Sequence, residues 1–166
     1  MNSILRRRSI RQYTGQKIQA EHIKKILEAA MSAPSAGNEQ PWHFIIVNDT
    51  QMLERLSQIH RHASMVKHAA AAIVVCGDLN LEIKKGMWVQ DCSAATENIL
   101  IEVEELNLGA VWVGVYPRED RIKHVQKLFD LPINVIPMSI VPIGYPAENF
   151  DTYSRYDESR VHYEAW

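Results

Sequence analysis

The sequence has few cysteines, few glycines, no long apolar run and almost no excess of charge. Its two cysteines, Cys76 and Cys92, form neither a CxxC pair nor a spacing typical of zinc sites, so we expect free thiols in a reducing cytoplasm. The net charge of -2 over 166 residues lacks the broad basic face of a nucleic-acid binder. The longest apolar run, 69–76, is too short to cross a bilayer, and the first residues lack the apolar segment of a secretory signal.

Motifs that carry chemistry by themselves are also missing. None of the seven glycines forms the GxG of a Rossmann fingerprint. Gly109 and Gly114 are spaced as in a P-loop, but Val115-Tyr116 stands where Lys-Ser/Thr is required. The sequence has no HExxH motif, and the three histidines within 60–68 are spaced poorly for one helix face. We therefore expect no metal site.

Hydrophobic periodicity predicts a single domain over residues 1–166 in which helices and strands alternate. Apolar residues make up 46 % of the chain, which is sufficient for a core. Helices are expected at 2–7, from 19 to Pro34, from 50 to about 59, at 87–107 and at 117–129, and strands at 42–47, 69–77, 110–115 and 135–144. This order indicates an α+β or α/β fold with a mixed sheet.

Three features of the second half of the chain give more specific expectations. Gly109 is placed to be the C-cap glycine of the 87–107 helix, and Pro137 and Pro142 predict that the last strand lies at an edge or a bend. The 87–107 helix is apolar on more than one side, which indicates a dimer interface, although a central helix in a monomer has the same pattern. The aromatic tail at 145–166 has no period, so we expect it to cover a neighbouring surface such as a partner subunit.

The first candidate binding segment is the basic run Arg7-Arg8-Ser9-Ile10-Arg11. A terminal phosphate carries close to two negative charges, and arginine and serine supply the fixed donors that it requires. Arg7 and Arg11 would share one face of a helix while Ser9 points away, so a common ligand requires the helix to end near Arg8. A solvated basic turn is the alternative.

The second candidate segment is the loop Pro34–Trp42, with the sequence PSAGNEQPW. Its small residues allow the backbone to approach a flat ligand, and Gly37 can adopt a positive φ. Asn38 and Gln40 each carry a donor and an acceptor, which match ribityl hydroxyls or the pyrimidine edge of a flavin. An ordinary loop between a helix and a strand is the alternative.

Taken together, these segments resemble the nitroreductase family of FMN-dependent oxidoreductases. The resemblance extends over nearly the whole chain, in the order that the family shows. It is carried by RRSIRQY at 7–13, APSAGN-x-QPWHF at 33–44, KHA at 67–69 followed by IVVCGD, QDCSAA at 90–95 with Asn98, LGAVWVG at 108–114, PIGYP at 142–146 and RVHY at 160–163.

The resemblance implies an α+β fold with a mixed or antiparallel sheet and a homodimer with swapped terminal segments. FMN would bind where the two chains meet, with its phosphate held by Arg7, Arg8, Ser9 and the tail residue Arg160. Arg11 would lie near the pyrimidine end and tune flavin N1. The remaining residues are Pro34, Ser35, Ala36 and Asn38 from the partner, Val113 and Gly114 near the reactive edge of the ring, and Gln40 and Lys67 as weaker matches.

The resemblance also implies an enzyme of the cytoplasm that passes electrons from NADH or NADPH to a nitroaromatic or quinone-like acceptor in a ping-pong cycle. No catalytic side chain is required, because the cofactor carries the chemistry. Two alternatives remain, a non-catalytic FMN sensor and a dehalogenating or flavin-cleaving relative. The short segment between Gly114 and Val135 has little room for the helices that larger members place over the flavin.

Overall fold

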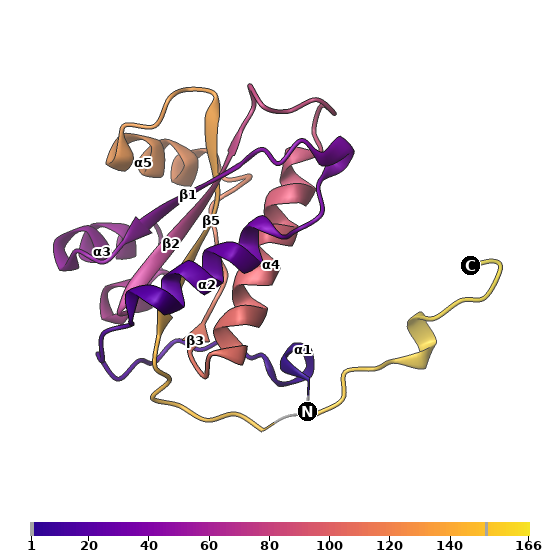
Figure 1. The fold of residues 1–166 in the computed structure, drawn as a ribbon, viewed down its shortest axis with the longest axis horizontal. Coiled ribbons are helices and arrows are strands. Elements are labelled where there is room, and N and C mark those ends of the chain that lie inside the picture. Colours follow the sequence, from indigo (N-terminus) through magenta and orange to yellow (C-terminus); the bar gives the residue numbers. More distant parts are fainter. Residues whose placement is uncertain (1, 152) are drawn as a thin grey trace.

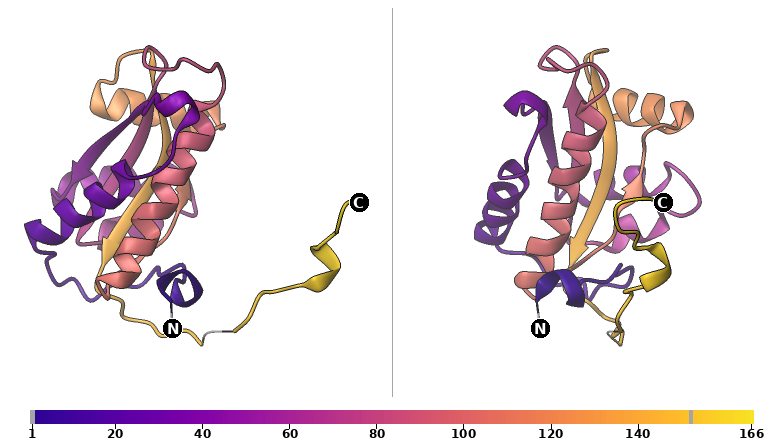
Figure 2. Two further views of the ribbon diagram at one scale, coloured as in Figure 1. Left: turned by 45° about the vertical axis from the view of Figure 1, so that its right-hand side comes forward. Right: turned by 90° about the vertical axis from the view of Figure 1, so that its right-hand side faces the viewer.

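The computed structural model describes residues 2–151 and 153–166 and shows an antiparallel sheet between two layers of helices (Figures 1 and 2). This arrangement confirms the α+β class. The elements in chain order are α1 (Ser3–Arg6), α2 (Ala20–Met31), η1 (Ala36–Asn38), β1 (Trp42–Val47), α3 (Thr50–Ser57), η2 (Ser64–His68), β2 (Ala71–Asp78), α4 (Trp88–Glu105), β3 (Gly109–Ala110), β4 (Val113–Gly114), α5 (Glu119–Phe129), β5 (Val135–Gly144) and η3 (Glu158–Arg160).

Strand β2 forms the centre of the core. The sheet order is β1-β2-β5-β3, and β4 also pairs with β5. Because side chains alternate across a strand, Ile73 and Val75 of β2 face the cluster formed with α2 and α4, whereas Val74 and Cys76 face the cluster around α3 and α5. A strand that is buried on both faces is continuously apolar, which is why this run was recognisable in the sequence.

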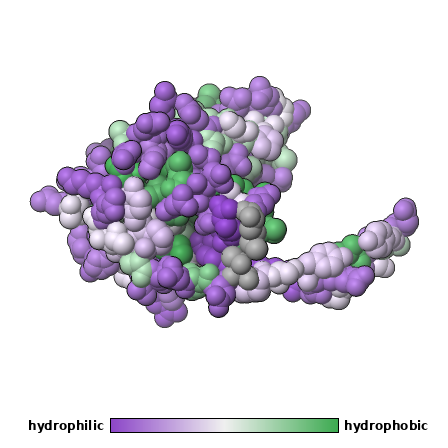
Figure 3. Space-filling model, turned by 60° about the horizontal axis from the view of Figure 1, so that its bottom comes forward, coloured by the Kyte–Doolittle hydropathy of each residue, from purple (hydrophilic) through white to green (hydrophobic). Residues whose placement is uncertain are grey.

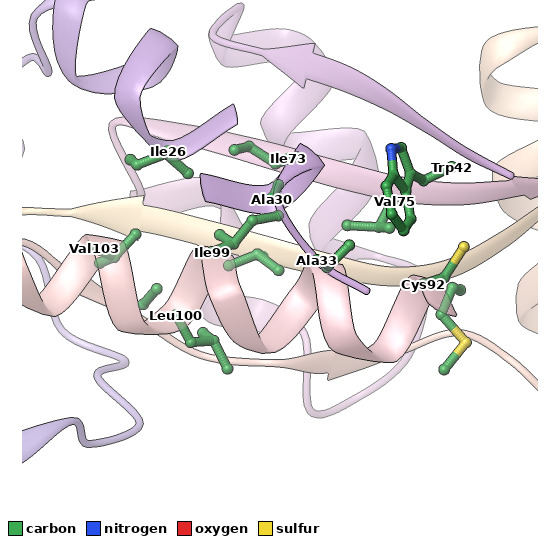
Figure 4. Packing of buried hydrophobic residues seen from close by; sticks show 14 of the residues in the cluster. Ile26, Ala30, Ala33, Trp42, Ile73, Val75, Cys92, Ile99, Leu100 and Val103 are labelled. Atoms are coloured by element: carbon green, nitrogen blue, oxygen red, sulfur yellow. The ribbon is translucent and has the colours of Figure 1, made fainter. Parts of the chain in front are cut away.

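Helix α4 packs along α2 and over the sheet (Figure 4). Its Ile99 and Val103 are buried in one cluster with Ile26 and Ala30 of α2. Leu100, from the second apolar side of α4, is only 4 % exposed within this single chain. Part of the two-sided apolar pattern is therefore explained by the chain's own core, and the dimer interface on α4 stays a prediction.

The expectation of an edge strand at 135–144 is wrong. Strand β5 pairs with β2 on one side and with β3 and β4 on the other. Pro137 lies opposite Cys76, where the ladder has a register shift, and Pro142 lies between the residues that pair with β3 and β4. Both prolines therefore occupy positions where a regular ladder is interrupted, and this allows a proline inside a sheet.

The end of α4 also differs from the expectation. Asn107, not Gly109, takes the left-handed conformation after the helix, with φ 56°. Gly109 instead begins β3, and the strand expected at 110–115 is divided into β3 and β4. Residues 147–151 lie beside the basic segment, where the Ala147 N–H donates to the carbonyl oxygen of Gln12 over 2.9 Å, and the last described residues of the chain are exposed and stand away from the body (Figures 1 and 3). Contact between this tail and a partner remains a prediction.

Gly109 is required by a close approach that fixes the basic segment to the sheet. A Cβ atom at this position would lie 2.7 Å from Cγ2 of Ile10, whereas a Cβ on Gly114 would meet no atom within 4 Å. We expect Gly109→Ala to lower the free energy of unfolding by about 1–3 kcal/mol through overpacking. Gly114→Ala is the matched control, and equal urea midpoints for the two variants would contradict the packing argument.

Candidate functional site

The basic segment leaves the helical conformation where a shared ligand requires it to. Helix α1 ends at Arg6, and Arg7 is its C-cap residue. Ser9 then forms a parallel bridge with Ala110 of β3, and the Ile10 N–H donates to the carbonyl oxygen of Ala110 over 2.8 Å. The expected end of the helix near Arg8 is thus confirmed, and the segment is anchored to the sheet.

Two arginines of this segment differ in how their donors are used. Nε of Arg7 lies 3.5 Å from Oε1 of Glu97 on α4. One terminal nitrogen of Arg8 donates to the carbonyl oxygens of Leu5 and Arg7, over 3.1 and 2.8 Å. The other, Nη2, is buried and has no hydrogen-bond partner in the described part of the chain. A buried cationic donor without an acceptor is costly, so an anion placed within its reach would be bound favourably.

Arg7 and Arg8 line a cavity of about 360 Å³. The described residues that line it include three arginines and no carboxylate: Ile4, Leu5, Arg7, Arg8, Tyr153, Ser154, Arg155 and Tyr156. The guanidinium groups of Arg8 and Arg155 lie 5.4 and 5.6 Å from the ring centroid of Tyr153, within the range of cation–π attraction. This arrangement can hold a small anion of high charge.

Arg160, which the sequence indicated as the tail cation, does not line this cavity. Its side chain is 85 % exposed, and its Nε lies 3.0 Å from Oδ2 of Asp157 in the same turn. Within one chain the tail arginine that lines the cavity is Arg155, and contact of Arg160 with a phosphate stays a prediction. The tail contains both arginines in an irregular segment, so spacing alone did not distinguish them.

Ser9 and Arg11 remain near the cavity in sequence but are not among the residues that line it. The backbone N–H of Arg11 donates to Oε1 of Glu148 over 2.6 Å. Its guanidinium donates to the carbonyl oxygen of Ser9 over 3.3 Å and is otherwise exposed. Arg11 is therefore held at its backbone, with its charge directed to solvent.

The loop of residues 34–41 lies at the N-terminal end of α4, whereas Arg6 of α1, directly before the basic segment, contacts Glu104 toward the other end of the helix (Figure 1). Gly37 has the expected positive φ, 60°, and Asn38 and Gln40 share the left-handed region. The amide of Gln40 donates to Oδ1 of Asn38 over 2.8 Å, and the Gln40 N–H donates to Oγ of Ser35 over 3.0 Å. One chain therefore does not bring Asn38 and Gln40 to the arginine cavity.

The remaining predicted residues lie on other elements. Val113 and Gly114 form β4, and the carbonyl oxygen of Gly114 accepts a hydrogen bond from Arg121 over 2.8 Å. Lys67 lies in η2, and its Nζ is 4.0 Å from Oε1 of Glu54. Residues of η2 pack with α3, on the sheet face opposite to α4. A Cβ atom on Gly114 would meet no atom within 4 Å, so the space beside this residue is open.

Metal chemistry has no support in the described residues, which contain no group of three or more histidine, cysteine, aspartate or glutamate side chains able to hold an ion. In the same part of the chain, no helix has the length and apolarity needed to span a membrane.

Comparisons with known proteins agree with the motifs. The model of the family described as "Nitroreductase family" matches residues 4–88 and 60–145. A protein of Methanothermobacter thermautotrophicus, named "Putative NADH dehydrogenase/NAD(P)H nitroreductase", is 51 % identical over 166 residues, which are 100 % of this chain and 87 % of that protein. The chain belongs to the nitroreductase family.

Solved structures support the same assignment for this nitroreductase-family chain. A structure titled "Putative NADH Oxidase" from Clostridium acetobutylicum has a TM-score of 0.96 at 44 % identity, covering 99 % of this chain and 100 % of that one. An "FMN-dependent Nitroreductase" of Clostridium difficile has a TM-score of 0.93 at 30 % identity, with 99 % of each chain covered. The short length of this nitroreductase-family chain is therefore shared by both.

The two cysteines of the nitroreductase-family chain are unsuited to nucleophilic chemistry. Both are fully buried, and burial raises the pKa of each thiol to about 12. At pH 8 only about one thiol in ten thousand would then be ionised, so a thiol reagent should label neither cysteine in the folded protein. We expect both to react once urea unfolds the chain. Rapid labelling of the native protein at pH 8 would contradict this burial.

Proposed function

We propose that the protein is an FMN-dependent oxidoreductase that takes electrons from NADH or NADPH and passes them to a small organic acceptor. Nitroaromatic and quinone-like compounds are the proposed acceptors, the proposed order is ping-pong, and the proposed unit is a homodimer of single-domain chains. The observation that carries the proposal is the arginine-lined cavity with the unpartnered Nη2 of Arg8. Family membership and the names of the relatives support it.

The residues at the cavity fit the phosphate of FMN. Arg7, Arg8 and Arg155 supply charge-assisted donors, and a phosphate oxygen would satisfy the buried Nη2 of Arg8. The hydroxyl of Ser9 and the positive charge of Arg11 extend the site toward the rest of the cofactor. Arg155 takes the role that the sequence suggested for Arg160.

The loop at 34–41 would reach the ring from the partner chain. In one chain this loop contacts α4 at Asp91, whereas Arg7 and Arg6 contact it at Glu97 and Glu104, about 9 and about 20 Å further along the helix. A second chain that supplies Pro34, Ser35, Ala36 and Asn38 removes this separation. Gln40 orients Asn38 through their hydrogen bond, and the open space beside Gly114 leaves room for a flat ring near the backbone of β4.

When bound, FMN supplies the two-electron chemistry, and the chain's own residues position and polarise it. Arg11 places a positive charge near the pyrimidine end, where a cation favours added negative charge on the ring. Lys67 is a second candidate for this role. Neither residue needs to transfer a proton. The described residues that line the cavity contain no carboxylate or histidine that could form an acid–base pair.

An absorption spectrum of the purified protein, followed by NADH or NADPH addition without oxygen, tests the proposal. A flavin spectrum that bleaches with the reductant and returns when a nitroaromatic or quinone is added would support it. A spectrum that persists would indicate an FMN sensor, and a colourless protein that does not bind added FMN would overturn the proposed function.

The tail residues give a discriminating prediction for the phosphate site. Loss of a charge-assisted hydrogen bond costs about 1.5–3 kcal/mol, so Arg8→Ala and Arg155→Ala should each raise the Kd for FMN at least about tenfold. Arg160→Ala should change it less than about twofold, because Arg160 lies outside the cavity. Flavin fluorescence titration measures all three, and a larger effect at Arg160 than at Arg155 would reverse the assignment.

Shared sites can be tested by mixing two defective chains. Arg8→Ala removes a phosphate donor, and Ala36→Phe blocks the ring side of the loop, so each homodimer should bind FMN poorly. A mixed dimer, isolated with two affinity tags, should regain one tight site if the segments come from different chains. If each site were formed within one chain, the mixed dimer would have no intact site and would show no recovery.

A further inference from the structure

Two buried carboxyl groups face each other beneath the loop at 34–41. Glu39 is 8 % exposed and Asp91, in the first turn of α4, is 4 % exposed. The two side chains interact, because each is among the groups that shift the pKa of the other. Each belongs to a different segment, so together they join the loop to the helix.

One oxygen of each carboxyl group is used by the backbone. Oε2 of Glu39 accepts hydrogen bonds from the N–H groups of Ile83 and Lys84, over 2.6 and 2.8 Å. Oδ1 of Asp91 accepts a hydrogen bond from the N–H of Ala36 over 2.9 Å. These contacts connect the loop at 34–41, the loop at 79–87 and the start of α4.

The second oxygen of each group, Oε1 of Glu39 and Oδ2 of Asp91, is buried without a hydrogen-bond partner in the described residues. Two neighbouring carboxylates that are both ionised repel each other, whereas one shared proton would give both of these oxygens a partner. Burial, and then the charge of Glu39, raises the pKa of Asp91. Although burial alone would raise it, the pKa of Glu39 is lowered because the N–H groups of Lys84 and Ile83 favour its charged form. The opposite directions of the two shifts favour Asp91 as the carrier of a shared proton and Glu39 as its acceptor.

Two other ionisable groups act on this pair, both from the loop at 79–87. The negative charge of Glu82 further raises the pKa of Asp91, and the positive charge of Lys84 helps to lower the pKa of Glu39. Both effects favour the state in which Glu39 is ionised and Asp91 is protonated. The surroundings thus reinforce a single-charge pair.

The loop that this pair holds has an unusual backbone. Gly37, Asn38 and Gln40 have φ values of 60°, 56° and 46°. For residues other than glycine this region costs roughly 1–2 kcal/mol each, so it persists only where the surroundings impose it. The hydrogen bond from Ala36 to Asp91 lies directly before these residues and is one of those constraints.

We propose that Glu39 and Asp91 are positioning residues whose shared proton holds the loop in the conformation that presents Asn38 and Gln40 to the flavin. Loss of that proton would weaken flavin binding. The effect on flavin binding rests on the proposed function. The clamp, by which we mean the Glu39–Asp91 pair and its hydrogen bonds to the loop, is a property of the flavin-free chain.

The directions in which the pKa values of Asp91 and Glu39 are shifted determine how the stability of the clamp depends on pH. Below its ordinary pKa of 3.8 in the unfolded chain, Asp91 is protonated in both states and its contribution to stability is fully present. The contribution is lost as pH rises through the raised pKa of the folded state. At the acid end the clamp weakens when Glu39 is protonated through its lowered pKa. The loop is therefore best held between these two pKa values.

Asp91→Asn provides the test, because an amide cannot titrate but keeps both hydrogen bonds. Its oxygen accepts from Ala36 and its nitrogen donates to Glu39. Wild type and variant are titrated with FMN between about pH 5 and pH 9, and the ratio of their Kd values cancels ionisation of the FMN phosphate. At pH values above the one at which the pair loses its proton, the Kd of the wild type divided by the Kd of Asp91→Asn should rise with pH. The rise should approach about tenfold per pH unit for the loss of one proton. A ratio independent of pH would overturn the inference.

Two further variants separate this clamp from a general charge effect. Glu21→Gln removes an exposed carboxylate of α2 and should leave the pH profile parallel to that of the wild type. Glu82→Gln should move the profile to lower pH, because it removes a negative charge that raises the pKa of Asp91. Equal shifts from both variants would indicate net charge instead of the pair.

Hydrogen exchange provides a readout that needs neither flavin nor a substituted chain. In the flavin-free wild type, exchange at residues 36–40, corrected for intrinsic pH dependence, should accelerate as pH rises through the titration of the pair. If this occurs in a protein that does not bind FMN, the proposed function fails but the clamp stands. If FMN binds and exchange shows no such change, the clamp is wrong.

Discussion

The packing of α4 against the sheet is the constraint on which the candidate site depends. Ile99 and Val103 are buried with Ile73 of β2, and full burial of such side chains contributes about 1.5–3 kcal/mol each. Contacts of this kind are non-directional, but they fix the helix on which Asp91 and Glu97 stand. The polar contacts of the loop and of the basic segment are then formed with a rigid body, so little additional entropy is lost in ordering them. The weaker, directional interactions of the site thus depend on the stronger apolar ones.

The distribution of charge explains why the cavity can select an anion in a protein with a slightly negative net charge. Glu97 forms an ion pair with Arg7 at the edge of the basic segment, and Glu104 lies 3.1 Å from Arg6. These pairs hold the backbone of the segment in place. The described residues that line the cavity nevertheless include three arginines and no carboxylate. A local positive field of this kind attracts a dianionic group even where the whole surface carries both signs. The stacking of Arg8 on Tyr153 also orients the guanidinium without neutralising it.

Local signals in the sequence predicted the elements well, and interactions between distant segments were not predictable in the same way. Strand β1 was predicted with its observed bounds, and the short helix expected at 2–7 is present as α1 with Asn2 as its N-cap, because both elements depend on neighbouring residues. The edge position of β5 was wrong because a proline reports a missing N–H, not the number of neighbouring strands. The sequence did not single out Arg155, which lines the cavity, because an irregular tail has no period that directs one side chain inward. The pairing of Glu39 with Asp91 depends on burial at a tertiary contact, and no local pattern distinguishes these residues from ordinary surface acids.

Because the two segments lie at different positions along α4, each chain of the proposed dimer would contribute to two flavin sites. Its basic segment would serve one flavin, and its loop at 34–41 would serve the other. Both segments contact the same helix, so a change at Asp91 affects the ring side of one site while the phosphate side of that site, formed by the other chain, keeps its arginines. Retention of the phosphate and orientation of the ring are then separable in energy, because the groups that control them are on different chains. A carboxyl pair suits the orientation of the ring, since a single proton determines whether it attracts or repels and no contact with the ligand is needed.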